Sequence, residues 1–448
     1  MAFFSPFSPQ KSGIADYSEE LLPRLGDLAD VDLVVGPYGC FNQSIRERFR
    51  IRETVEFLAD SDSYDAVVYQ IGNNLGHHGY MLPAMRQVPG ILVLHDYCLQ
   101  YLMLGLTVQQ GNFQALVEIL RPSFGASATW MALRFLLNAA DPNLVSFAWP
   151  LVTMNKAVIV HSQFARDSVI HDHPSKLVKV IPMGVPDDLP LPAAGLRAEL
   201  GFDESDFIIA SISTLSRSKR LDVALRSIAS VRRQLPRLKF VIVGGGSLGD
   251  QTREIIRELK LDENVVVTGW VPHERYRALI AVADLVVDLR YPSGAETSAS
   301  LTRAIAAGKP LIVSQQGTFL EIPDDFSRKI PVGAEEEKSL VEAILELALN
   351  PELRSEMAQK SRDFFLAHLR LEQAASAYVE FAIEVEKQPQ SAPFVTWPSR
   401  EPHPLARPLI AAAYKATRLG YLYRNYGWKD TWRRVHEELQ LKPEGPSS

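Results

Sequence analysis

The sequence lacks the marks of several protein classes. Only two cysteines occur in 448 residues, Cys40 and Cys98, which excludes a disulfide scaffold and favours a reducing compartment. The most apolar stretches, such as 144–154, are much shorter than the roughly 18 residues that indicate a membrane-spanning helix. No charged segment leads into an apolar run after Met1, so we expect no signal peptide and a cytoplasmic location.

The charge balance and composition are those of an ordinary globular protein. The net charge of −6, from 47 basic and 53 acidic residues, is too small to indicate a nucleic-acid partner. Hydrophobic residues make up 46% and charged residues 22% of the chain, which excludes disorder or a coiled coil for the chain as a whole. The length corresponds to about three domains of roughly 150 residues.

Short runs of branched apolar residues alternate with longer stretches of helical periodicity, which is typical of a doubly wound α/β sheet. A first series of expected strands covers residues 2–5, 31–35, 66–71, 91–94 and 157–161. A second series covers residues 207–213, 239–243, 264–268, 285–289 and 310–314. We therefore predict two Rossmann-like domains, 1–182 and 183–370, facing each other across a cleft, with ligands outside the carboxyl ends of the strands.

The C-terminal part is expected to be a helical extension rather than a third domain. A helix over 371–388 is predicted to return to the first domain, and 389–448 to form a proline-rich linker and a basic, aromatic helical tail. The segment 404–434 carries seven basic residues and one acid, a local charge of +6 that leaves −12 for the rest. It could bind an anionic membrane surface. The alternative is a helix packed on the first domain or on a partner enzyme.

A glycine-rich turn follows an expected strand. VIVGGGSLG matches the dinucleotide fingerprint through Gly244, Gly246 and Gly249. The acidic residue that the fingerprint requires is missing, because the next strand leads into Trp270. We therefore favour a tight turn beside another nucleotide, with Gly245 close to it, over a site for NAD.

Two further turns precede expected helices. Ser12 and Gly13 could hold a phosphate at a helix N-terminus, or Ser12 could simply cap that helix. Ser293 and Glu296 form an S-x-x-E capping box, which predicts a helix from there to about Ala307. The same helix start could instead hold an anion or a ribose through Gly294, Thr297 and Ser298.

Six short motifs recur in a familiar order. They are SGIADYS at 12–18, YQIGNN at 69–74, LHDY at 94–97, VIVHSQFAR at 158–166, SKRLD at 218–222 and GAETSASLTRAIAAGKP at 294–310. Together they resemble family-4 retaining glycosyltransferases of the GT-B fold, in a bacterial branch that assembles polysaccharides of the O-antigen type. The resemblance covers roughly residues 1–385.

The resemblance implies a nucleotide diphosphate sugar bound mainly by the second domain and a glycan or lipid-linked acceptor on the first. It implies no metal, no further cofactor and no protein nucleophile, because the site only stabilises the departing diphosphate. The catalytic residues by this resemblance are His95, Asp96 and Lys219. The donor-binding residues would be Gly13, Arg217, Arg220, Gly245, Glu296, Thr297, Ser298 and Arg303. The acceptor-binding residues would be Asp16, Tyr17, Asn73, Asn74 and His77.

Two positions depart from the family pattern. Thr214 stands where the family has a phosphate-binding arginine, which Arg217 or Arg220 could replace. Arg303 stands where the family has a glutamate that accepts hydrogen bonds from the ribose, and a guanidinium can only donate. Either Glu296 or Glu321 could supply that carboxylate.

The sequence leaves a metal site and two other functions open. The adjacent His77 and His78 suggest a metal, but no accompanying ligand motif supports one. The departures from the family pattern at Thr214 and Arg303 suggest one alternative, a sugar-nucleotide-binding scaffold that has lost catalytic turnover. A second alternative is a sugar-nucleotide epimerase of the same fold. For the enzyme, we expect peripheral attachment at the inner face of the plasma membrane if the tail binds lipid.

Overall fold

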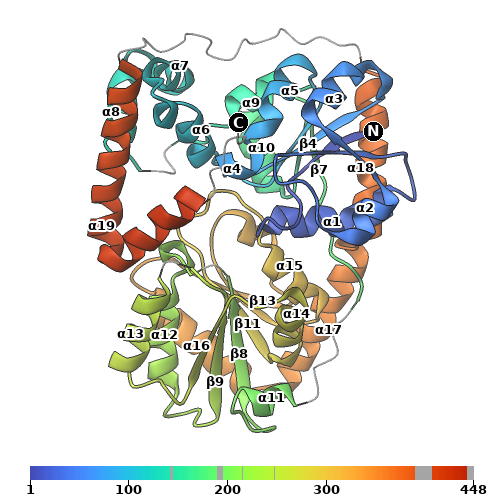
Figure 1. The fold of residues 1–448 in the computed structure, drawn as a ribbon. Helices are drawn as coiled ribbons and strands as arrows, with labels where there is room; N and C mark the ends of the chain where they lie inside the picture. Colours follow the sequence, from blue (N-terminus) through green and yellow to red (C-terminus); the bar gives the residue numbers. More distant parts are fainter. Residues whose placement is uncertain (142–144, 189–194, 214, 247, 389–405, 441–448) are drawn as a thin grey trace. The chain divides into compact units, whose positions relative to one another are not determined.

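The computed structural model describes the whole chain except residues 142–144, 189–194, 214, 247, 389–405 and 441–448. Its internal contacts divide it into two compact units (Figure 1). The first unit comprises 1–182, 294–297 and 374–448, and the second comprises 183–293 and 298–373. Most of the linker predicted after residue 388 lies outside the described residues.

The first unit is built on a seven-stranded sheet in the order β3-β2-β1-β4-β5-β6-β7, and its strand pairs are parallel. The strands are β1 Ala2–Phe4, β2 Asp32–Val35, β3 Arg50–Glu53, β4 Val67–Ile71, β5 Ile91–Leu94, β6 Ala157–Val160 and β7 Val178–Val180. The five predicted strands are confirmed. The two edge strands β3 and β7 escaped prediction because their sequences, RIRE and VKV, are short and partly polar.

The second unit has a six-stranded sheet in the order β10-β9-β8-β11-β12-β13, again with parallel pairs. The strands are β8 Phe207–Ile212, β9 Leu238–Val243, β10 Val265–Gly269, β11 Leu285–Asp288, β12 Leu311–Ser314 and β13 Ser327–Ile330. Only β13, with the sequence SRKI, was not predicted. Two such sheets with their connecting helices confirm the predicted pair of Rossmann-like units.

Helices connect the strands of both sheets. Those of the first unit are α1 Gly13–Leu25, α2 Gln43–Arg48, α3 Thr54–Ala59, α4 Leu75–His78, α5 Leu82–Gln87, α6 Gln100–Leu106, α7 Phe113–Phe124, α8 Ala128–Leu136, α9 Trp149–Met154 and α10 Gln163–Asp172. Those of the second unit are α11 Leu196–Glu199, α12 Leu221–Val231, α13 Gly249–Glu258, α14 His273–Val282, α15 Ala299–Ala306, α16 Glu336–Leu349 and α17 Pro351–His368. Two C-terminal helices follow, α18 Leu371–Glu386 and α19 Ala406–Gln440.

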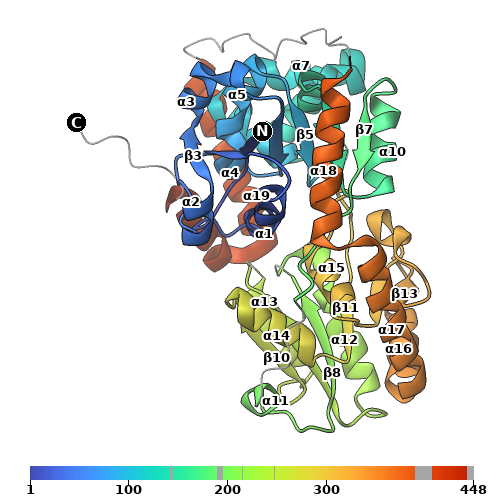
Figure 2. The ribbon, with the colours of Figure 1, turned by 90° about the vertical axis from the view of Figure 1, so that its right-hand side faces the viewer.

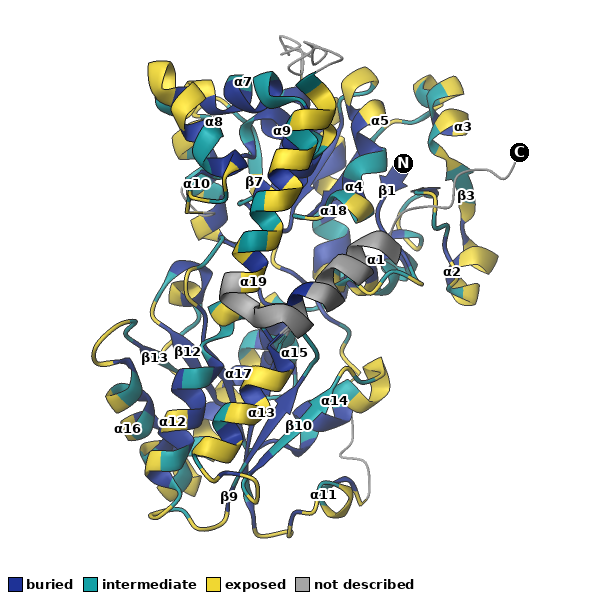
Figure 3. Cartoon of the chain, turned by 60° about the vertical axis from the view of Figure 1, so that its left-hand side comes forward, coloured by how far each residue is buried: buried dark blue, intermediate teal, exposed yellow. Residues whose placement is uncertain are grey.

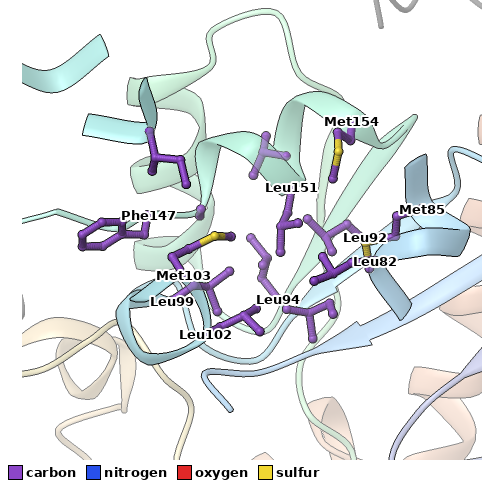
Figure 4. Close-up of a cluster of buried hydrophobic side chains, with 14 of the residues drawn as sticks. Leu82, Met85, Leu92, Leu94, Leu99, Leu102, Met103, Phe147, Leu151 and Met154 are labelled. Carbon is purple, nitrogen blue, oxygen red and sulfur yellow. The ribbon is translucent and has the colours of Figure 1, made fainter. Parts of the chain in front are cut away.

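Each sheet is covered on both faces, which explains why its strands read as apolar runs. In Figure 3 the central strands of both units are buried, while their helices expose one side. The edge strands β3, β7 and β10 are only partly buried. Figure 4 shows part of the first unit's core, where Leu92 and Leu94 of β5 meet Leu82 of α5 and Leu151 of α9. Among the described residues, none of the helices has the length and apolarity to cross a membrane.

Helix α19 packs against two helical elements that lie between β5 and β6 in the sequence. They are α8 and the 3-10 turn η3, Val108–Gln110. Tyr414 is buried there, with 1% of its surface exposed. The hydroxyl of Thr417 donates to the carbonyl of Leu136 at 2.8 Å, and Arg407 Nε donates to the carbonyl of Gln110 at 3.0 Å. For residues 406–423 the structure therefore shows the packed arrangement, one of the two expectations for the tail.

We expect the substitution Tyr414→Ala to destabilise the first unit, because it would leave a cavity beneath α19. Urea unfolding followed by fluorescence should show a loss of about 3 kcal/mol. Tyr423, on the same helix and 57% exposed, provides the control, and Tyr423→Ala should cost about 0.5 kcal/mol or less. Equal unfolding midpoints for the two variants would contradict the docking of α19.

Candidate functional site

A charged cluster lies at the carboxyl edge of the second unit's sheet. Asp288 ends β11, and Lys219 lies in the 3-10 turn η5, Arg217–Lys219, which follows β8. Lys219 Nζ lies 3.7 Å from Asp288 Oδ1, and Arg290 Nη2 lies 3.9 Å from Asp288 Oδ2. The hydroxyl of Ser298 donates to Asp288 Oδ2 at 2.6 Å. Four side chains from three segments thus meet where ligands of such sheets bind.

The electrostatics of this cluster favour an ionised carboxylate between two cations. Burial by itself raises the pKa of Asp288, but Lys219, Arg290 and the hydroxyl of Ser298 together lower it below its usual value. The guanidinium of Arg290 also lies over the ring of Phe319, with 5.3 Å between its carbon and the ring centroid. The cluster carries a net charge of +1, which suits an anionic ligand.

Sequence reasoning missed Asp288 and Arg290. The signal was present, because an acidic residue ends the otherwise apolar run LVVD at the ligand edge of the sheet. An acidic residue at the end of an inner strand is buried by the neighbouring strands and helices. A buried charge requires oppositely charged or hydrogen-bonding partners. Lys219, predicted to act on the leaving phosphates, is one of those partners.

The glycine-rich turn between β9 and α13 packs against the loop that leads to Lys219. The amide of Leu215 donates to the carbonyl of Gly245 at 3.0 Å. A Cβ atom on Gly246 would lie 2.6 Å from the carbonyl oxygen of Leu215, whereas one on Gly245 would meet nothing closer than 3.5 Å. Gly246 is therefore required for the close approach of two loops, and Gly245 is the less crowded of the two.

Arg220 does not lie free beside the cluster, contrary to the prediction that it could take over from the missing arginine. It stands at the N-terminus of α12 with a left-handed backbone, φ 51°, and its guanidinium forms two hydrogen bonds with the buried Glu336. That interaction raises the pKa of Arg220. Arg217, the other residue predicted to replace that arginine, is exposed. Thr214 lies outside the described residues.

The predicted capping box at Ser293 and Glu296 is wrong. Helix α15 begins at Ala299 with Ser298 as its N-cap. The helix cannot start earlier because Ala295 has φ 61°, in the left-handed region. Glu296 instead accepts a hydrogen bond from the amide of Gly294 at 2.6 Å.

The remaining donor-side candidates occupy two elements and a turn. Arg303 lies on α15, where its Nη1 donates to the carbonyl of Ala299 at 3.5 Å. Thr297 is half-buried, one residue before the N-cap of that helix, in the segment 294–297 that groups with the first unit. Glu321 is exposed at the end of the 3-10 turn η6, Gly317–Glu321.

At the N-terminus of α1 the structure shows the predicted cap, and phosphate binding there stays a prediction. The hydroxyl of Ser12 caps the helix by accepting from the amide of Ile14 at 3.3 Å. Gly13 is exposed, and no atom lies within 4 Å of where its Cβ would be, so a ligand can approach the backbone there. Asp16 is exposed in the first turn. Tyr17 is buried, which corrects the expectation of a surface that touches an acceptor.

His95 and Asp96 directly follow β5, at the strand end where they were predicted, but their side chains face protein groups. His95 is buried, and its Nε2 lies 2.6 Å from Gln70 Oε1. Burial, and the neighbouring His161 and His78, hold the pKa of His95 well below its usual value, so its ring is neutral. This corrects the expectation of an open sugar contact. Asp96 Oδ2 accepts from the amide of Asn73 at 2.9 Å.

The residues after β4 serve as helix caps. Asn73 Oδ1 accepts from the amides of Tyr101 and Leu102 at 2.7 and 3.1 Å, which satisfies the first turn of α6. Asn74 caps α4 through the amide of His77 at 3.2 Å. The ring of His77 is half-buried, and burial lowers its pKa. Across the described chain, no three His, Cys, Asp or Glu side chains converge as they would around a metal ion.

Residues 194–364 match the family model described as "Glycosyl transferases group 1". Alpha-galactosylglucosyldiacylglycerol synthase of Streptococcus pneumoniae is 29% identical over 230 residues, which cover 48% of this chain and 59% of that protein. The GDP-mannose-dependent alpha-(1-6)-phosphatidylinositol monomannoside mannosyltransferase of Mycobacterium tuberculosis is 24% identical over 217 residues, 46% of this chain and 56% of that protein. The chain thus spans little more than half the length of these relatives.

Solved structures show the same fold across most of the chain. Anabaena HepE in complex with UDP and glucose aligns with a TM-score of 0.61 at 16% identity, covering 86% of this chain and 99% of that one. A sucrose-phosphate synthase from Thermosynechococcus elongatus aligns with a TM-score of 0.61 at 17% identity, covering 86% and 98%. At these identities the likeness shows the fold alone.

The Asp288 cluster predicts a pH-dependent loss of stability. Asp288→Asn should lower the free energy of unfolding of the second unit by about 3 kcal/mol at neutral pH, because two cations lose the carboxylate between them. Since the pKa of Asp288 is lower in the folded state, its contribution is present above the unfolded pKa of about 3.9 and disappears as the pH falls through the folded value. Urea unfolding as a function of pH measures both effects.

The matched control for this variant is Asp222→Asn, which removes one partner of an exposed ion pair with Arg226. It should cost about 0.5 kcal/mol or less. An Asp288→Asn variant no less stable than this control at neutral pH would refute the role assigned to the carboxylate. The role would also be refuted if the loss of unfolding free energy in Asp288→Asn, relative to the unmodified chain, stayed the same as the pH fell below about 3.9.

Proposed function

Because residues 194–364 match the model of the group 1 glycosyl transferases and the chain has the GT-B fold, we propose that the protein is a retaining glycosyltransferase. It would move a sugar, of the hexose type, from a nucleotide diphosphate sugar to a glycan or lipid-linked glycan. The observation that carries this proposal is the cationic cluster of Lys219 and Arg290 around Asp288 at the ligand edge of the second sheet.

The second unit supplies the groups that a departing diphosphate requires. Lys219 and the exposed Arg217 follow β8, and the glycine turn Gly244–Gly246 packs on the same loop. Asp288 fixes the position of the Lys219 ammonium, so little reorganisation is needed when charge develops on the leaving phosphate. The proposed chemistry uses these cations and backbone amides, with the acceptor hydroxyl as the nucleophile and no metal.

Support for a lipid-linked or surface-glycan acceptor comes from the names of the relatives. The pneumococcal relative is a synthase of a diacylglycerol glycolipid, and the mycobacterial one acts on a phosphatidylinositol mannoside. We extend this to the present chain as a proposal, with bacterial surface polysaccharide synthesis as its setting. The exposed start of α1, with Gly13 and Asp16, is the part of the first unit that we assign to ligand contact.

We further propose peripheral attachment to an anionic membrane, at the cytoplasmic face, through α19. While Tyr414 packs inward, Leu409 is 72% exposed and Tyr423 is 57% exposed. Exposed Ala413 and Ala416 lie between them at helical spacing, so this face is apolar, and the exposed Lys415 lies beside it. The sequence from 402 to 429 contains no acid, which favours an anionic surface.

The nucleotide site predicts ligand-dependent stabilisation that Lys219 controls. In a thermal-shift screen of nucleotide diphosphate sugars, a bound donor at 100 times its Kd should stabilise the chain by about 2.7 kcal/mol. Lys219→Ala should remove most of this shift. Lys338→Ala, which removes an exposed lysine of the same unit, should keep it. Absence of any shift with the common nucleotide sugars would count against the proposed function, and an undiminished shift in Lys219→Ala against the site.

The membrane proposal predicts flotation with anionic vesicles. The chain should float with vesicles rich in phosphatidylglycerol but not with phosphatidylcholine alone, and Leu409→Glu should reduce flotation because it places an acid on the apolar face of α19. Leu349→Glu alters a residue of the second unit that is 67% exposed and should have no effect. If both variants float like the unmodified chain, α19 is not the attachment surface.

A further inference from the structure

Five polar side chains come together inside the first unit, each from a different segment. They are Tyr17 of α1, Gln70 of β4, His95 after β5, His161 after β6 and Tyr378 of α18. All five are buried, with at most 6% of their surface exposed. Figure 2 shows α18, the element that brings Tyr378, in front of the sheet of this unit. A buried group of this kind needs hydrogen-bond partners.

The rings of this group, which we call the Tyr–His cluster, lie in mutual contact. The ring centroids of His95 and His161 are 4.7 Å apart, and Tyr17 lies edge-on to both at 5.6 and 5.7 Å. Tyr378 interacts with two of these neighbours. Burial raises the pKa of Tyr378 to about 12, while the Tyr17 hydroxyl and the Gln70 amide act to lower it. The cluster therefore links α18 directly to the loop that ends β5.

Each member keeps one polar atom that forms no hydrogen bond of good geometry with another protein group. These atoms are Tyr17 Oη, Gln70 Nε2, His95 Nδ1, His161 Nε2 and Tyr378 Oη, and all are buried. The other ring nitrogens are engaged, since His95 Nε2 meets Gln70 Oε1 at 2.6 Å and His161 Nδ1 meets the carbonyl of Ile181 at 2.8 Å.

The two histidines point to the protonation pattern of the cluster. With Nε2–H donating to Gln70, the Nδ1 atom of His95 is an acceptor; with Nδ1–H donating to a carbonyl, the Nε2 atom of His161 is also an acceptor. The tyrosine hydroxyls and the Gln70 amide can donate. The Tyr17 and Tyr378 hydroxyls and the Gln70 amide lie near one another, but they form no hydrogen bond of good geometry. Such a group of buried donors and acceptors matches the surroundings of an internal water, which usually has about three partners.

We propose that the Tyr–His cluster encloses an internal water site, and that Gln70 and Tyr378 act through it as positioning residues for the loop His95–Asp96. The bound water donates to the histidine acceptors and accepts from a tyrosine or the amide. It thereby holds the His95 ring neutral, as the Nε2–H tautomer. Because Asp96 accepts from the amide of Asn73, the same hydrogen bonds also fix the loop after β4. The kinetic consequence of this proposal rests on the proposed function.

The test compares two Tyr→Phe variants of the full chain. Tyr378→Phe removes one buried hydroxyl at almost constant volume, and Tyr423→Phe removes an exposed one as the control. The imidazole ¹⁵N resonances of His95, assigned with a His95→Gln variant, should show an untitrated Nε2–H tautomer between about pH 6 and 8. Tyr378→Phe should move the Nδ1 resonance of His95, and Tyr423→Phe should not.

Kinetics and an atomic-resolution structure complete the test. In the transfer reaction, Tyr378→Phe should lower kcat by about tenfold and leave KM for the nucleotide sugar within about twofold. A structure should show a water within hydrogen-bond distance of His95 Nδ1. Unchanged resonances and kcat in Tyr378→Phe, or direct side-chain hydrogen bonds in place of the water, would overturn the proposal. If the unmodified chain transfers no sugar, the proposed function fails, while the resonances and the water still decide this inference.

Discussion

The carboxylate of Asp288 is the constraint on which the second unit's site depends. It ends an apolar strand at the ligand edge of the sheet, where burial alone would make its ionised form unfavourable. Lys219 and Arg290 compensate for that cost, and in return the carboxylate holds two cations at fixed positions beside a helix N-terminus. The surrounding loops follow from this arrangement, because Gly246 must lack a side chain for the Leu215 loop to approach.

The first unit uses buried polar groups differently. In the second unit charge is concentrated around Asp288, whereas His95, Gln70 and Tyr378 form a neutral group whose ring nitrogens and hydroxyls are hidden from solvent. Asn73 and Asn74 likewise serve the backbone, as caps of α6 and α4. The side chains that follow the strands of this unit therefore shape its loops, whereas Gly13 and Asp16 at the start of α1 are exposed.

The fold could be predicted from the sequence because strands buried on both faces appear as short, continuous runs of apolar residues. The prediction failed at β3, β7 and β13, edge strands whose polar residues hide the pattern. At the candidate site, the motifs lie on loops that follow the strands, but the motifs could not tell which side chains turn inward. Arg220 pairs with Glu336 from 116 residues away, and Tyr17 meets Tyr378 from a distant helix; such partners depend on tertiary packing. The capping box at Ser293 failed because Ala295 adopts a left-handed backbone that local sequence does not dictate.

The most direct test of this account is a crystal structure of the chain with the nucleotide diphosphate that stabilises it best. The account predicts diphosphate oxygens within ion-pair distance of Lys219, with Asp288 still between Lys219 and Arg290 and the nucleotide beside the turn Gly244–Gly246. A diphosphate bound elsewhere on the chain, with the cluster of Lys219, Asp288 and Arg290 untouched, would contradict it.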